Sequence, residues 1–268
     1  MKRLTFVLCI ALIAVLGLSQ AYAGLFSVFE QSALSGKKDK GALEAYAQYG
    51  QSVGAEAQSG VAKLKVQDIF RDGMQTKISF IITNIDIAET DRFSPEFRMR
   101  DSLGNVYDRH ATECKHDRKQ RVVSGVVEFE PIADREITSL ELFLRENSSN
   151  LEWSVAFNVD PRKVGPQARK YSVGALAGID DKVVEIVEIV STPSMARIYL
   201  NSEVPLYCGE VKSRTGNTVA EFMQGFAPLK QNGNWTHEWT FNPIPPEKDL
   251  VLVVQTTAGE TLEIPFKL

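Results

Sequence analysis

The chain has 268 residues, 44% hydrophobic and 24% charged, a composition typical of globular proteins that excludes a disordered, collagen-like or multi-span membrane protein. Its formal charge is −4, from 30 Lys and Arg against 34 Asp and Glu. Nucleic-acid binding domains carry an excess of basic residues. We therefore expect no nucleic-acid partner.

The N-terminus predicts a secretory signal peptide over residues 1–23. Lys2 and Arg3 precede an apolar run over residues 4–18, and an A-x-A cleavage site ends at Ala23. This run is shorter than the roughly 20 residues that cross a bilayer, so no transmembrane span is expected after cleavage. Cleavage leaves 245 residues, and the loss of the two basic residues lowers the charge from −4 to −6. The sequence thus predicts an exported protein, periplasmic or extracellular.

Residues 24–60 form an N-terminal helical segment in this interpretation. A short amphipathic helix from about Lys40 to Ala57 is predicted because apolar and small residues recur at helical spacing. These residues are Ala42, Leu43, Tyr46, Ala47, Gly50 and Val53. The helix either lies on the first domain of its own chain or docks on a partner or a surface.

An internal repeat organises the rest of the chain. Residues 101–107 (DSLGNVY) match residues 213–219 (SRTGNTV) at an offset of 112, whereas residues 64–80 match residues 184–200 at an offset of 120. The difference of eight places an insertion in the first copy, around residues 86–95.

The copies span residues 61–159 and 182–268, and the Pro- and Gly-containing stretch 160–181 is interpreted as a linker. Each copy contains about seven short apolar or β-branched runs between turn signals, as in an antiparallel sandwich. Gly104-Asn105 and Gly216-Asn217 supply the positive φ angles of tight hairpins. The predicted fold is all-β, with two tandem immunoglobulin-like antiparallel β-sandwiches.

A family resemblance supports this fold. Thr83-Asn84, followed by Phe97, Asp101, Gly104 and Tyr107, resembles the T-N and F-x-x-x-D-x-x-G-x-x-Y pattern of bacterial secreted immunoglobulin-like domains of unknown function. The second copy has Ser213 and Val219 at the Asp and Tyr positions, so the resemblance there depends on the repeat. The resemblance implies a fold and export, and it brings no catalytic residues.

One cluster has the chemistry of a metal site. His110, Cys114 and His116 lie within seven residues, and imidazole and thiolate groups are ligands for zinc or copper. If Cys114 and both His residues lie on one continuous strand, they share a face. The corresponding positions of the second copy are Phe222, Phe226 and Pro228, which favours a core edge with incidental polar residues. Both interpretations remain open.

The mature chain keeps two cysteines, Cys114 and Cys208, in a compartment where disulfides persist. Cys208 corresponds to Glu96, in the strand before the Gly104-Asn105 hairpin, and Cys114 lies in the strand after it. Because the two cysteines belong to different copies, a disulfide between them would cross from one domain to the other. A disulfide and two free thiols are both possible.

Aromatic residues mark a strand in the second copy. Trp235, His237 and Trp239 alternate, and an exposed row of this kind stacks on sugar rings in glycan-binding proteins. The corresponding residues of the first copy are Val123, Gly125 and Val127, which favours a face directed into the core.

Nothing in the sequence predicts catalysis. No G-x-S-x-G motif is present, and the chain has three His residues. We expect an exported, non-catalytic binding or scaffolding protein that recognises a protein partner of the cell envelope through sandwich loops or edges. The alternatives are a periplasmic zinc- or copper-binding protein, a glycan-binding module and a pilus-type chaperone, of which the last has a basic cleft that does not fit an acidic chain.

Overall fold

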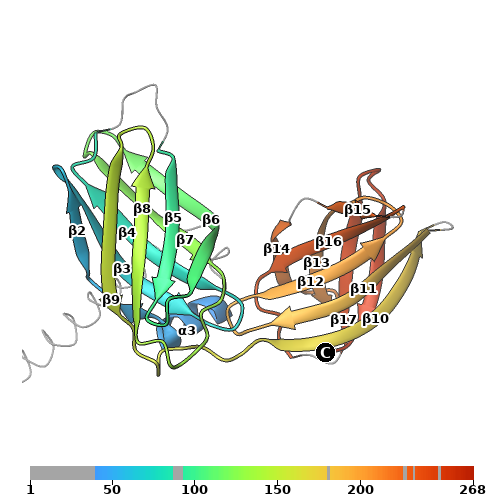
Figure 1. The fold of residues 1–268 in the computed structure, drawn as a ribbon. Helices are drawn as coiled ribbons and strands as arrows, with labels where there is room; N and C mark the ends of the chain where they lie inside the picture. The colour runs from blue at the N-terminus through green and yellow to red at the C-terminus, as the bar shows by residue number, and fades with distance from the viewer. Residues whose placement is uncertain (1–39, 87–92, 180–181, 226–227, 232, 247–248) are drawn as a thin grey trace, which may run out of the picture.

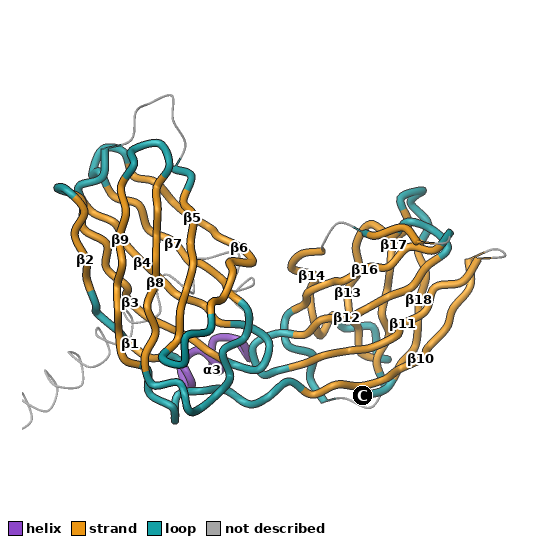
Figure 2. The backbone as a smooth tube through the Cα atoms, in the orientation of Figure 1, coloured by secondary structure: helices purple, strands orange, loops and turns teal. Residues whose placement is uncertain are grey.

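A computed structural model describes residues 40–86, 93–179, 182–225, 228–231, 233–246 and 249–268. The signal-peptide prediction for residues 1–23 lies outside these residues. The described part contains one short helix and two antiparallel sheets (Figures 1 and 2), so the all-β prediction is confirmed. No helix within it has the length and apolar character needed to cross a membrane.

Helix α3 spans Lys40–Tyr49. It buries Ala42, Ala45 and Tyr46 against Phe70 and Val126 of the first sheet, as expected for a helix that packs on its own domain. The helix is shorter than predicted because it ends before Gly50, whose N–H donates to the carbonyl oxygen of Tyr46 at 2.8 Å. Residues 51–59, expected to belong to the helix or its segment, contain two short strands instead.

The first sheet contains nine strands in the order β1-β3-β4-β7-β6-β5-β8-β9, with β2 paired to β3. Its strands are β1 (Gln51–Ser52), β2 (Glu56–Ser59), β3 (Ala62–Arg71), β4 (Thr76–Thr83), β5 (Pro95–Asp101), β6 (Val106–Asp117), β7 (Val122–Phe129), β8 (Ser139–Glu146) and β9 (Leu151–Asn158).

The second sheet also contains nine strands, in the order β10-β11-β12-β16-β14-β13-β17-β18, with β15 paired to β16. Its strands are β10 (Arg169–Ile179), β11 (Lys182–Ser191), β12 (Ala196–Ser202), β13 (Leu206–Ser213), β14 (Thr218–Gly225), β15 (Leu229–Gln231), β16 (Asn234–Phe241), β17 (Leu250–Thr256) and β18 (Thr261–Phe266).

The two sheets therefore share one strand order. Adding 120 to the residue numbers of β3 gives the bounds of β11. Eleven residues separate β4 from β5, and three separate β12 from β13. The eight extra residues of the first copy lie in this connection. The hairpin glycines are also equivalent, since Gly104 has φ 90° and Gly216 has φ 88°.

The interpretation of residues 160–181 as a linker is wrong over Arg169–Ile179. This segment is β10, which pairs along its length with β11. Its register shifts between Ser172 and Ala175 because Gly174 adopts φ 61°. Gly54, between β1 and β2, has φ 71°, so the first strand of each copy is interrupted at the same place. Only the stretch after β9 and before β10 connects the two sheets.

Each sheet bends around a hydrophobic core of its own. In the first sheet the edge strands β2 and β9 approach each other, and Glu152 N of β9 donates to Ser59 Oγ of β2 at 3.2 Å. The core of the first sheet includes Phe80, Phe97 and Phe129. The core of the second sheet includes Trp239, Phe241 and Ile264. The chain thus has two separate cores instead of one large one.

Candidate functional site

Strand β6 carries the three residues of the metal hypothesis. It pairs with β5 only from Val106 to Asp108 and then with β7 from Arg109 to Asp117. His110 is the extra residue of a β-bulge at this change of partner, so it leaves the alternation that the hypothesis requires. Among the described residues no group of three His, Cys, Asp or Glu side chains is placed to hold a metal ion. The structure therefore does not bring His110, Cys114 and His116 together as a ligand set.

The same strand has a free edge. From Arg109 to Asp117, β6 pairs with β7 alone among the described strands. On its other side lies an open cavity of about 540 Å³, lined by Phe93, Ser94, Pro95, Glu96, Arg109, Thr112, Cys114 and Asn147. Arg109 spans the gap to β5 by donating to the carbonyl oxygen of Pro95 at 2.8 Å. The hydroxyl of Thr112 is buried and has no hydrogen-bond partner among the described residues.

Both cysteines are free in the structure. Cys114 lies on β6, in the first sheet, whereas Cys208 lies on β13, in the second, and its thiol donates to Gln255 Oε1 at 3.6 Å. The disulfide alternative is thus not formed. Desolvation by neighbouring groups, together with the charge of Glu113, raises the pKa of Cys114 to about 12. This thiol is protonated at neutral pH and is a weak nucleophile.

The aromatic strand of the second copy, β16, points mostly into the core. His237 and Trp239 are buried, and their rings lie 5.7 Å apart. Trp235 is half-buried beneath Lys230, whose Nζ lies 5.2 Å from its ring. Trp235 and Trp239 therefore do not form an exposed platform for sugars. Burial lowers the pKa of His237 to about 4, and its Nε2 has no partner among the described residues.

The motif behind the family resemblance stabilises a turn. The carboxylate of Asp101 accepts hydrogen bonds from the backbone of Leu103 (2.8 Å) and Asn105 (2.9 Å) and from the hydroxyl of Tyr107 (2.7 Å). Although burial acts to raise the pKa of Asp101, these hydrogen bonds outweigh it and lower the pKa. The side-chain amide of Asn105 also donates to Asp101 Oδ2, at 2.8 Å. Each carboxylate oxygen thus accepts two local hydrogen bonds, and the motif is a structural element of the β5–β6 turn.

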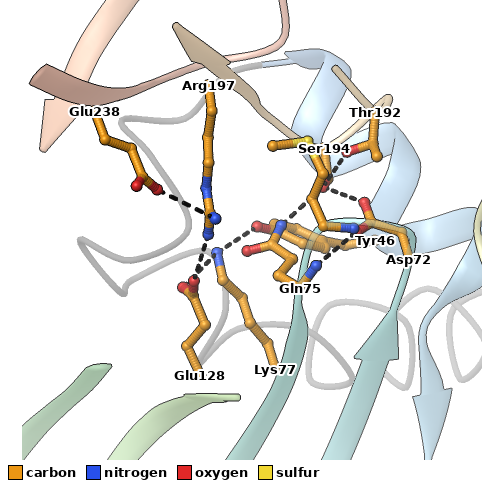
Figure 3. Close-up of polar contacts among 10 residues, drawn as sticks. Tyr46, Asp72, Gln75, Lys77, Glu128, Thr192, Ser194, Arg197 and Glu238 are labelled. Atoms are coloured by element: carbon orange, nitrogen blue, oxygen red, sulfur yellow. Dashed lines mark hydrogen bonds and ion pairs between the residues drawn. The ribbon is translucent and has the colours of Figure 1, made fainter. Parts of the chain in front are cut away.

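The two sheets meet through equivalent turns (Figure 3). The turn between β3 and β4 contacts the turn between β11 and β12: Ser194 Oγ donates to Asp72 Oδ2 at 2.5 Å, and Gln75 Nε2 donates to Ser194 Oγ at 2.8 Å. Burial raises the pKa of Asp72, although the hydroxyl of Ser194 and the N–H of Met74 partly oppose this. Met74, Val190 and Met195 form a small apolar cluster beside these contacts.

Charged side chains extend this junction. Glu128 of β7 lies 3.9 Å from Lys77 Nζ and 4.0 Å from Arg197 Nη2, and Arg197 also pairs with Glu238 at 3.3 Å. Figure 3 shows Arg197 between the two carboxylates, with Lys77 directed at Tyr46 of the helix. Burial acts to lower the pKa of Lys77, but Tyr46 and Glu128 more than offset it, and the pKa is raised. One buried carboxylate thus joins cations from both sheets. No motif or residue spacing in the sequence predicts this cluster.

The fold and its two-sheet arrangement define an all-β protein that resembles known structures. The chain is similar to the crystal structure of the conserved domain protein from Bacillus anthracis, with a TM-score of 0.54 and 12% sequence identity over 88% of this chain and 96% of that chain. An identity this low shows a shared fold only. No protein-family model and no curated protein matches the sequence.

Proposed function

We propose that this chain is an exported, non-enzymatic binding protein of the cell envelope, built from two tandem immunoglobulin-like sandwiches. The strongly bent antiparallel sheets, each with its own core, support the sandwich assignment. The basic start, apolar run and A-x-A site before Gly24 support export.

The free edge of β6 supports recognition of a protein partner. Its nine residues from Arg109 to Asp117 pair on one side only among the described strands. An extended peptide adds to such an edge through main-chain hydrogen bonds, and neighbouring cavities select its side chains. Exposed Glu96 lines the cavity beside β6 and offers its carboxylate for this purpose.

The placement of the reactive side chains favours binding over catalysis. A nucleophile or general base must reach a substrate with a suitable protonation state. The pKa of Cys114 is raised to about 12, and His237 is buried in the core of the second sheet. The buried acid–base cluster around Glu128 contacts both sheets, where it holds the junction.

A photo-crosslinking amino acid at Lys115 tests the proposal in the native envelope. Lys115 is exposed on β6, whereas Thr236 is exposed on β16, which pairs on both sides. We expect a discrete crosslinked species from position 115 and none from the control at position 236. Absence of any adduct at 115, or equal adducts at both positions, contradicts partner recognition at this edge. Cell fractionation with N-terminal sequencing tests export separately, and we expect a mature chain that begins at Gly24.

A further inference from the structure

A second cavity lies at the base of the second sheet, which is the end of the sheet at the turn between β11 and β12. It has a volume of about 510 Å³ and is bordered by the start of β10, the turn after β11, the start of β14 and the loop after β16. Gly41 of helix α3 and Pro166 and Gln167 of the connecting stretch also line it. Its walls include Tyr171, Pro193, Val219, Ile244 and Pro245, and Arg169 is its one charged lining residue. A pocket of this size with apolar walls and one cation is typical of a ligand site.

The first sheet shows what occupies the same place in the other copy. There the chain that follows β9 crosses the base and buries Val159 and Val164. Asp160 N donates to Gln51 Oε1 at 2.7 Å, and its carbonyl oxygen accepts from Arg71 Nη2 at 3.1 Å. Gly165 N then donates to the carbonyl oxygen of Arg71 at 2.8 Å. The base of the first sheet is therefore closed by an extended stretch of its own chain, residues 159–165.

The second copy has smaller side chains at these positions. Arg71, which is fully buried, corresponds to Ser191, and Tyr107 corresponds to Val219. Among the described residues that line this cavity, none follows β18, the strand equivalent to β9. Ser191 and Val219, which line the cavity, are thus smaller than Arg71 and Tyr107 at the corresponding positions of the first copy.

We propose that this cavity binds an extended peptide segment of a partner protein, which occupies the base of the second sheet as residues 159–165 occupy the base of the first. Two small apolar side chains five residues apart, like Val159 and Val164, insert between the cavity walls. An acidic residue of the peptide pairs with Arg169, which has no ion-pair partner among the described residues. This site is separate from the β6 edge of the first sheet, so the experiments can contradict one proposal without contradicting the other.

Residues 157–167 of the chain itself provide the probe. In the first copy Lys163 Nζ donates to the carbonyl oxygen of Gln48 at 2.9 Å. Gln48 precedes Tyr49, which matches Arg169 in sequence but ends helix α3, whereas Arg169 begins β10. A fluorescent peptide of this sequence with Lys163→Glu is designed to place a carboxylate near Arg169. We expect saturable binding to the full mature chain by fluorescence anisotropy. We expect at least tenfold weaker binding of the same peptide with Val159→Asp and Val164→Asp.

Two variants restore the side chains of the first copy, Ser191→Arg and Val219→Tyr. Each is expected to weaken binding at least tenfold, whereas Thr236→Tyr, on the exposed face of β16, leaves it unchanged. Arg169→Gln is expected to remove the preference for the Lys163→Glu peptide over the unmodified sequence. Thermal unfolding confirms that each variant is folded, and if one is not, the other tests the site.

Three outcomes overturn the proposal. These are no saturable binding of either peptide, equal binding of the valine-to-aspartate peptide, and binding unaffected by both Ser191→Arg and Val219→Tyr. Sedimentation of the unliganded chain adds a further test. A concentration-dependent dimer that Val219→Tyr abolishes would assign the cavity to a second copy of this chain, contrary to the proposal.

Discussion

The two sheets have the same strand order but differ in the side chains and segments that cover their bases. The base of the first sheet is filled by Arg71 and closed by residues 159–165, whereas the second sheet has Ser191 at the position of Arg71 and keeps a cavity. The ladders and the hairpin glycines are retained in both. Main-chain pairing and core side chains preserve the repeated fold, while the loops at the strand ends are free to differ. The features that distinguish one copy from the other are therefore the best places to look for recognition.

Arg71→Ala is the substitution with the largest expected effect on this comparison. It removes a fully buried side chain and one of two hydrogen bonds to the carbonyl oxygen of Asp160, of which the other comes from Lys163 N at 3.0 Å. We expect a loss of about 3 kcal/mol in the free energy of unfolding, from the cavity and the lost hydrogen bond together. Ser191→Ala, at the corresponding position, is expected to change it by less than about 0.5 kcal/mol. Urea denaturation measures both. Equal losses would show that the two bases are not differently filled.

Glu128→Gln has the next largest expected effect on stability, and it concerns the junction between the sheets. Its carboxylate is buried and lies near Lys77 and Arg197, so the substitution leaves two cations without this anion. We expect a loss of about 2 kcal/mol, smaller than for an ideal buried pair because both distances are near 4 Å. Small-angle scattering is expected to show a wider range of arrangements of the two sheets. Glu238→Gln, at a more exposed carboxylate, is the control, with a loss below about 0.5 kcal/mol. A larger effect of Glu238→Gln would show that Arg197 is held mainly by Glu238 of its own sheet and not by Glu128 of the first sheet.

The sequence predicted the parts of this molecule that depend on local pattern. The all-β class, the presence of a helix before the first sheet and the turns at Gly104 and Gly216 follow from residue type and spacing. Strand β10 was missed because its glycines resemble those of a linker. Its Ser-Val-Gly-Ala at residues 172–175 nevertheless matches residues 52–55 at the offset of 120, a signal that would have found it.

The candidate sites were less predictable than the fold. The metal hypothesis assumed unbroken alternation along β6, and the bulge at His110 breaks it. A bulge of this kind leaves no mark in the sequence pattern. The junction depends on how two folded units contact each other through Asp72 and Ser194, and the cavity depends on which loop closes which base. Neither follows from the periodicity of one strand.

The two sheets are also expected to differ, by a smaller free energy, in how their stability changes with acidification. Burial lowers the pKa of His237 in the second sheet to about 4, below its ordinary 6.5, so the unfolded chain binds the extra proton first. The associated stability is complete above pH 6.5 and is lost as the pH falls toward 4. We expect a loss of about 1 to 2 kcal/mol after allowance for solvent screening.

Hydrogen exchange of the second sheet at pH 7 and pH 4.5 measures this loss, and His237→Phe is expected to remove it. Asp68 in the first sheet is the matched control of opposite sign. Burial raises its pKa to about 6, so its contribution favours the folded state as the pH falls through 6, and Asp68→Asn removes that gain. If His237→Phe leaves the acid sensitivity of the second sheet unchanged, another group is responsible.

The hairpin glycines give the smallest predicted effect and the one that is the same in both copies. Gly104 and Gly216 have φ 90° and 88°, and a Cβ at either position meets no atom within 4 Å. The cost of Gly→Ala is therefore backbone strain alone, about 1 kcal/mol at each position. The turn in the first copy is further tied by Asp101 and Tyr107, whereas Ser213 and Val219 occupy those positions in the second. If this network prevents relaxation, Gly104→Ala costs measurably more than Gly216→Ala in urea denaturation, and the two turns are then not equivalent. Equal costs mean that φ sets the penalty, because the side-chain network stabilises the turn without stiffening it.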